Sequence, residues 1–185
     1  LGALAAGPGC RKAPVRPERV VLLGFDGADP DLLGALVAQG RLPALAALQQ
    51  RGAYGPLRTF APVKSPVLWT SIATGKTMVK HGIVDWAHVD REGLRVPYES
   101  TARRARTYWE IFDEAGVSTG TLGWWLTSPP PALRHGFVVG DGYRVRPGPG
   151  LVHPPELHET LGPLLPRPHD VRREWQRLGL LDYSA

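Results

Sequence analysis

The chain has 185 residues, of which 43% are hydrophobic and 21% charged, and it carries a net charge of +5. This length suffices for one domain with its own core, or for a piece of a larger one. Its only cysteine, Cys10, excludes an internal disulfide framework and any multi-cysteine zinc site. The positive charge favours anionic partners, but the arginines are mostly dispersed, so nucleic acid is not expected as the primary partner.

Residues 1–18 are expected to be a leader or signal-peptide remnant followed by a linker. Residues 1–10 resemble the end of a signal peptide that stops at a lipoprotein cysteine, although Gly7 and Pro8 fit that pattern poorly. Cys10 is therefore a candidate lipid anchor, and a disordered leader or an arbitrary start are the alternatives. A lipid anchor implies an exported, periplasmic or cell-envelope protein, whereas the alternatives leave a cytoplasmic one.

The first strong structural signal is an apolar run over residues 19–25. Its sequence, Arg-Val-Val-Leu-Leu-Gly-Phe, is bounded by Pro17 and Gly27 and is typical of a strand buried on both faces. We predict a central strand of a parallel sheet there. Asp26 then lies at its carboxyl end, which is where open α/β sheets place their ligands.

Two helices and a short strand are predicted next. Asp29-Pro30-Asp31 supplies a cap, a proline and an acidic first turn for a helix that ends at Gly40. A second helix begins at Pro43 and stops at Gly52, and residues 54–60 are predicted as a short strand.

The following helix is predicted to begin on a serine hydroxyl. Ser65 stands at the expected N-cap, Pro66 at the first helical position, and Gly75 just past the last turn. The positive end of the helix dipole favours both an alkoxide and an anionic substrate. Ser65 is therefore a candidate nucleophile for attack on phosphate, with a plain N-cap as the alternative.

A serine hydroxyl needs activation, and no histidine lies beside Ser65 in a recognisable elbow. Metal coordination is the other route, and Asp26 is an oxygen ligand suited to Zn²⁺ or a similar ion that also binds Ser65. Both residues are predicted at one edge of the sheet. The alternative for Asp26 is that it only caps the turn that follows.

The rest of the chain alternates helices and strands, which predicts a parallel sheet with helices on both sides. Trp109 and Phe112 are expected to point inward from one helix. His81 is expected to be a structural hydrogen-bonding histidine, and Asp141 to form a turn. The predicted elements are a loop or hairpin over 88–100, helices over 107–115, 155–165 and 170–178, and strands over 117–125 and 137–139.

A nucleotide-binding loop is a competing interpretation, because Gly75-Lys76-Thr77 resembles the end of one. Such a loop needs a glycine five residues before Gly75 so that the backbone can wrap around phosphates. Thr70 stands there, and the residues before Gly75 are predicted to be helical. This interpretation is therefore rejected.

Several motifs together resemble a known family. Gly24-Phe25-Asp26-Gly27, Ser65, Thr74-Gly75 and His81-Gly82-Ile83 resemble the type I phosphodiesterase/nucleotide pyrophosphatase branch of the alkaline phosphatase superfamily. Gly123-Trp124-Trp125-Leu126-Thr127 and Val138-Val139-Gly140-Asp141 are similar to bacterial members. The resemblance implies an alkaline-phosphatase-like three-layer α/β sandwich with a mostly parallel sheet, incomplete in this chain, over residues 19–185.

The resemblance also implies a reaction. Phosphate mono- or diesters would be hydrolysed through a covalent Ser65 phospho-enzyme with two divalent metal ions, expected to be Zn²⁺. Asp26 would bind one ion, and Ser65 would be both nucleophile and ligand of that ion. Backbone N–H groups over residues 66–68 would face the phosphoryl oxygens. The expected substrate is a small-molecule or lipid-headgroup phosphate ester.

Departures from the family pattern limit these expectations. Nucleotide-cleaving members carry threonine as the nucleophile and asparagine three residues later, where this chain has Ser65 and Leu68. Leu68 and Trp124 are candidate substrate-binding residues, with core packing as the alternative for Trp124. The family's downstream Asp and His ligand motifs do not occur. We therefore expect the N-terminal part of a longer enzyme, inactive alone, or a truncated or degenerate domain that only binds.

Overall fold

The computed structural model describes residues 19–144, 147–164, 173 and 177. Its contacts divide the chain into two units, Leu1–Pro56 and Leu57–Ala185, and each unit is described by itself. Cys10 lies outside the described residues, and so does most of the helix predicted over 170–178. The lipid-anchor prediction and that helix therefore stay predictions.

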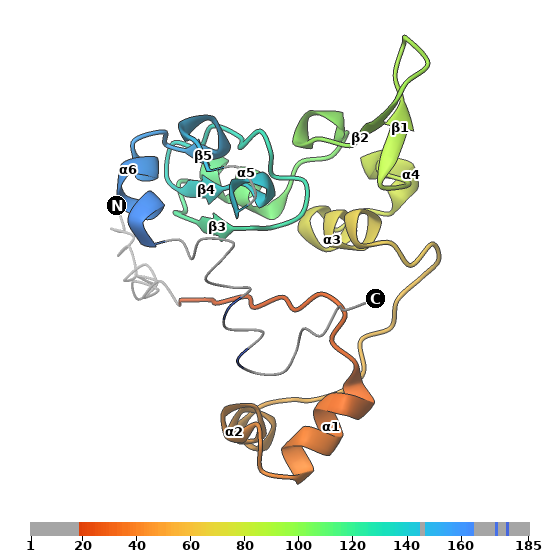
Figure 1. The fold of residues 1–185 in the computed structure, drawn as a ribbon, viewed down its shortest axis with the longest axis vertical. Coiled ribbons are helices and arrows are strands. Elements are labelled where there is room, and N and C mark those ends of the chain that lie inside the picture. Colours follow the sequence, from red (N-terminus) through yellow and green to blue (C-terminus); the bar gives the residue numbers. More distant parts are fainter. Residues whose placement is uncertain (1–18, 145–146, 165–172, 174–176, 178–185) are drawn as a thin grey trace, which may run out of the picture. The chain divides into compact units, whose positions relative to one another are not determined.

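The first unit contains two helices, α1 over Pro30–Ala38 and α2 over Pro43–Arg51 (Figure 1). Asp29 caps α1 as predicted, since its Oδ1 accepts hydrogen bonds from the N–H groups of Asp31 and Leu32 at 2.9 and 2.8 Å. No described helix is long and apolar enough to cross a membrane alone. The α1–α2 pair passes that test by length and composition, with a bend of 102°.

The buried strand predicted over residues 19–25 is wrong. The segment runs without strand pairing, and its apolar side chains are exposed, with Val20 at 87% and Leu23 at 72%. A strand buried on both faces needs neighbouring strands for its backbone groups and further layers for its side chains. The described part of this unit supplies two short helices and no strand. The strand predicted over 54–60 is also wrong, because these residues, which span the boundary between the two units, pair with no strand.

The second unit begins with α3 over Ser65–Thr74 and α4 over Met78–His81. Lys64, not Ser65, is the N-cap of α3, so Ser65 is the first helical residue and the predicted cap was one position late. Gly75 ends α3 in the left-handed region at φ 64°, as predicted. Thr70 lies inside α3, which agrees with the rejection of a nucleotide-binding loop.

An antiparallel hairpin follows, made of β1 over Ala87–Val89 and β2 over Arg95–Pro97 (Figure 1). This confirms the loop or hairpin predicted over 88–100. A short 3₁₀ turn then leads to α5 over Tyr108–Glu114, which begins with a capping box between Thr107 and Glu110.

The larger sheet has the strand order β3-β4-β5. Strand β3 over Gly120–Leu122 is parallel to β4 over Phe137–Val139, and β5 over Val152–His153 is antiparallel to β4. The first two strands were predicted, although β3 is shorter than expected, and β5 was not predicted. The chain is therefore a mixed α/β protein with small sheets, and the three-layer sandwich stays a prediction.

The strands are followed by short helical segments. Helix α6 covers Leu157–Leu161, inside the helix predicted over 155–165. Three 3₁₀ segments complete this part of the unit: Asp141–Arg144, Pro149–Leu151 and Gly162–Leu164.

The main core of the second unit joins α3, α5 and β4. Trp109 of α5 is fully buried, as predicted, whereas Phe112 is 44% exposed and its predicted inward position is wrong. Packing on one face holds α3 in place. The buried members of this cluster are Ala73, Trp109, Trp124, Leu133 and Val138, and a second cluster consists of Val139, Tyr143 and Val152.

Candidate active site

Ser65 is half-buried at the first residue of α3. The backbone N–H groups of Val67 and Leu68 both donate to the Lys64 carbonyl, each at 3.0 Å. The family resemblance implied that these N–H groups would face phosphoryl oxygens. In this structure they instead donate hydrogen bonds within the helix. The positive end of the helix dipole remains at Ser65.

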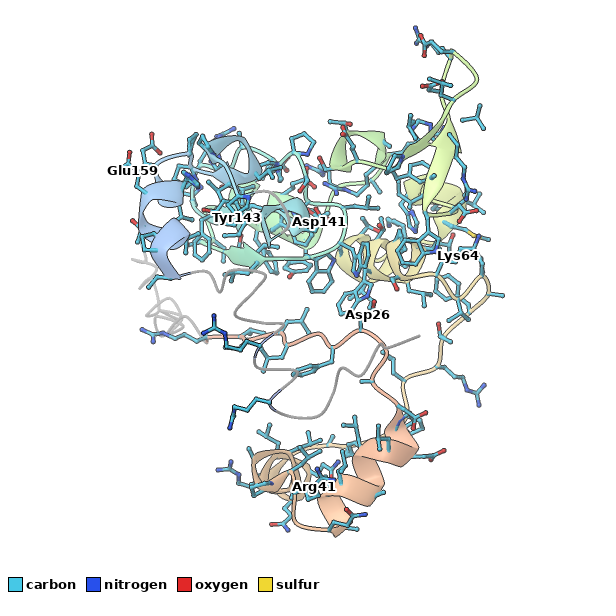
Figure 2. All side chains as sticks on the ribbon, viewed as in Figure 1. Asp26, Arg41, Lys64, Asp141, Tyr143 and Glu159 are labelled. Carbon is cyan, nitrogen blue, oxygen red and sulfur yellow. The ribbon has the colours of Figure 1, made fainter. Side chains whose placement is uncertain are left out.

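The residue before Ser65 is fixed by an ion pair. Lys64 is labelled in Figure 2, its Nζ lies 2.7 Å from Asp85 Oδ1, and both side chains are about two-thirds buried. The hydrogen bond from Lys64 and then that from the Trp86 backbone N–H lower the pKa of Asp85, so this carboxylate stays charged. The entry to α3 is thereby joined to the segment that leads into β1.

The side chains of Trp86 and Trp124 lie in different environments. Trp86 is 47% exposed and meets Trp125 edge to face, with ring centroids 5.2 Å apart. Trp124 is only 8% exposed, and its Nε1 donates to the Trp69 carbonyl at 3.1 Å. The structure thus places Trp124 in the core. Trp86 and Trp125 form an aromatic pair, and Trp86 directly follows the carboxylate that binds Lys64.

The turn that carries Trp125 is held by hydrogen bonds from other elements. Leu126 has a left-handed backbone at φ 59°, and its N–H donates to Asp141 Oδ2 at 2.9 Å. Arg103 Nη1 donates to the Leu126 carbonyl at 3.0 Å, and the Asp141 N–H donates to Thr127 Oγ1 at 3.1 Å. Asp141 therefore forms a turn, as expected. Sequence reasoning missed Arg103, because its partner is distant in the chain.

Asp26 lies in the first unit, in a turn with Gly27, whose φ is 68°. Ser65 lies in the second unit, so the two predicted metal ligands belong to different units of the chain. Their role as joint ligands stays a prediction.

A family model described as type I phosphodiesterase / nucleotide pyrophosphatase matches residues 20–176. The chain belongs to this family. Searches of curated proteins and of solved structures each gave no match. Asp26, Ser65, Trp86 and Trp125 all lie inside the matched region, and the family assigns phosphoester hydrolysis as the class of reaction.

Members of this phosphodiesterase family are generally metal-dependent, which raises the question of which residues in this chain could bind a metal ion. A zinc site takes four ligands, or three and a water. The described residues contain no group of three or more His, Cys, Asp or Glu side chains placed to hold a metal ion. Asp26 and Ser65 supply suitable oxygen atoms, so the described residues fit a metal site only in part.

His81 has a structural role, which confirms the expectation. It is fully buried, and the Ile83 N–H donates to its Nδ1 at 3.1 Å. The proton of the neutral ring is therefore assigned to Nε2, which donates to Ser71 Oγ at 2.9 Å, and Ser71 in turn donates to the Val67 carbonyl. His81 thus fastens α4 to α3.

The free energy of unfolding is expected to depend on pH through the protonation of His81. Burial, and secondarily the charge of Arg103, lower the pKa of His81 below 6.5. As the pH falls, the unfolded chain therefore takes up this proton first, and stability is lost from pH 6.5 downward toward the folded pKa. Urea unfolding at pH 8 and pH 5 measures the loss.

A His81→Gln variant cannot take up this proton, so its unfolding midpoint is expected to change less between the two pH values. A His88→Gln variant retains His81 and is expected to keep the wild-type pH dependence. An unchanged dependence in His81→Gln contradicts the assignment.

Proposed function

We propose that this protein hydrolyses phosphate mono- or diesters with Ser65 as the nucleophile. Family membership supports the class of reaction. The observation that supports the residue is the position of Ser65, which is half-buried at the first residue of α3. A hydroxyl at the positive end of a helix suits attack on an anionic phosphate.

The reaction proceeds in two displacements at phosphorus. Ser65 Oγ gives up its proton to solvent and attacks the phosphorus atom, a new Oγ–P bond forms, and the bond to the leaving oxygen breaks, with its electron pair going to that oxygen. Water then attacks the phosphorus of the phosphoserine, the Oγ–P bond breaks, the phosphate product is released, and a proton from water restores the Ser65 hydroxyl. The α3 dipole stabilises the negative charge near Ser65. A divalent ion, when bound, would favour the deprotonated hydroxyl.

Asp26 and Ser65 are proposed to contribute oxygen ligands to one of two divalent ions, with Zn²⁺ as the expected metal. Leu68 is proposed to contact the substrate, because residues three apart lie on the same face of a helix and Leu68 is half-buried. The proposed substrate is a small-molecule or lipid-headgroup phosphate ester.

The role of Asp26 is tested in the full-length protein with Zn²⁺ and a chromogenic phosphodiester. Asp26→Asn removes a charged ligand oxygen and is expected to lower kcat/KM by about a hundredfold or more and to reduce the bound zinc. Asp31→Asn, an equal change in the same unit, is the matched control and is expected to retain activity and zinc.

Full activity and full zinc content in Asp26→Asn would contradict the ligand assignment. If neither the wild-type protein nor the control hydrolyses any phosphodiester, the binding-only alternative is favoured over catalysis.

A further inference from the structure

A basic cleft lies at the opposite end of α3 from Ser65. Its volume is about 440 Å³, within the usual range for small-ligand sites. Helix α3 has ten residues, so its length puts the cleft about 15 Å from Ser65. The cleft is lined by Lys76, Lys80, Arg104 and Arg106, together with Thr74 and Ile111.

The positive charge of this cleft is mostly uncompensated. No carboxylate lines it. Arg106 pairs with Glu114, but within the described part of the chain no carboxylate pairs with Lys76, Lys80 or Arg104. Cations gathered around a concave space raise the local concentration of anions. The cleft therefore has the electrostatics of an anion site.

Two features fix the position of Arg104 in the wall of the cleft. Its N–H donates to the His81 carbonyl at 2.9 Å, and its side-chain stem lies over Gly82, whose φ is 82°. A Cβ at Gly82 would lie 3.0 Å from Arg104 Cδ, so glycine leaves the space that the stem occupies. An arginine placed in advance loses less conformational freedom when it binds a ligand.

We propose that this cleft binds a small ligand through a phosphate or pyrophosphate group. Lys76, Lys80 and Arg104, which pair with no carboxylate among the described residues, exceed what a single carboxylate can balance, whereas a phosphate dianion offers more charge and more acceptor oxygens. The Arg104 guanidinium can donate two parallel hydrogen bonds to such a group, and the lysines act as adaptable point charges. The site is separate from Ser65 and does not depend on the proposed hydrolysis.

The experiment uses the full chain with a Ser65→Ala substitution, so that binding is measured without turnover. Inorganic pyrophosphate is titrated calorimetrically at low ionic strength, because exposed charges are screened by salt. Arg104→Gln combined with Arg106→Gln is expected to weaken binding by about tenfold or more. Arg58→Gln combined with Arg91→Gln makes the same charge change at exposed positions outside the cleft and is expected to have little effect.

A second pair of substitutions, Lys76→Gln with Lys80→Gln, leaves the Arg104 stem in place over Gly82. It therefore tests the loss of charge in the cleft even if the first pair disturbs folding. Vesicles with and without phosphatidic acid distinguish a lipid headgroup from a soluble phosphate as the source of the group. Binding in either arm that both cleft pairs weaken supports the proposal. Absence of binding in both arms, or an equal loss in the Arg58/Arg91 control, overturns it and leaves the cations as charges that balance helix ends.

Discussion

Replacement of Ser65 by alanine in the full-length protein is expected to lower kcat/KM for a chromogenic phosphodiester by a factor of about 10³ or more. The variant lacks the proposed nucleophile, and no other hydroxyl on α3 can replace it: Thr74 is buried and donates to the Thr70 carbonyl at 2.7 Å. Thr70 is buried, and Ser71 is engaged with His81 and the Val67 carbonyl. Initial rates with Zn²⁺ measure the loss, and mass spectrometry of quenched reactions is expected to detect phosphoserine only when Ser65 is present.

Two variants separate loss of the nucleophile from a general defect. Ser65→Thr retains a hydroxyl and is expected to keep measurable activity and a phospho-enzyme. Thr77→Ala removes the hydroxyl at the N-cap of α4, where the side chain makes no capping hydrogen bond, and is expected to be neutral. Wild-type rates in Ser65→Ala would exclude Ser65 as nucleophile while leaving the family membership intact.

Helix ends could be predicted from the sequence because the groups that form them are close in the chain. Asp29 accepts from N–H groups two and three residues ahead, and Gly75 donates to Ser71. The assignment of Ser65 as the cap failed by one residue. The pattern Lys64-Ser65-Pro66 allows either residue to begin the helix, and the preference for serine at N-caps decided in favour of Ser65.

Features that depend on distant partners could not be predicted in this way. The apolar run over residues 19–25 has the composition of a buried strand, but burial requires other strands and layers that the run does not itself specify. Trp86 was missed because its position depends on the Lys64–Asp85 ion pair and on contact with Trp125. Sequence reasoning therefore found the nucleophile candidate but not the groups around it.

Trp109→Ala is expected to lower the free energy of unfolding by about 3–5 kcal/mol, the usual cost of removing a large buried aromatic side chain. Trp109 is fully buried in the main core, and its ring meets that of Trp124 at 6.0 Å. The substitution leaves a cavity between α5 and β4 that the short sheet cannot close. Urea unfolding followed by circular dichroism measures the change.

Two matched variants test whether burial causes this cost. Trp86→Ala removes the same side chain from a position that is 47% exposed and is expected to cost clearly less. Trp109→Phe keeps most of the ring and removes Nε1, which is buried without a hydrogen-bond partner among the described residues. Because that N–H is desolvated without compensation, Trp109→Phe regains part of what its smaller ring loses. Equal costs for Trp86→Ala and Trp109→Ala would contradict the placement of Trp109 at the centre of the core.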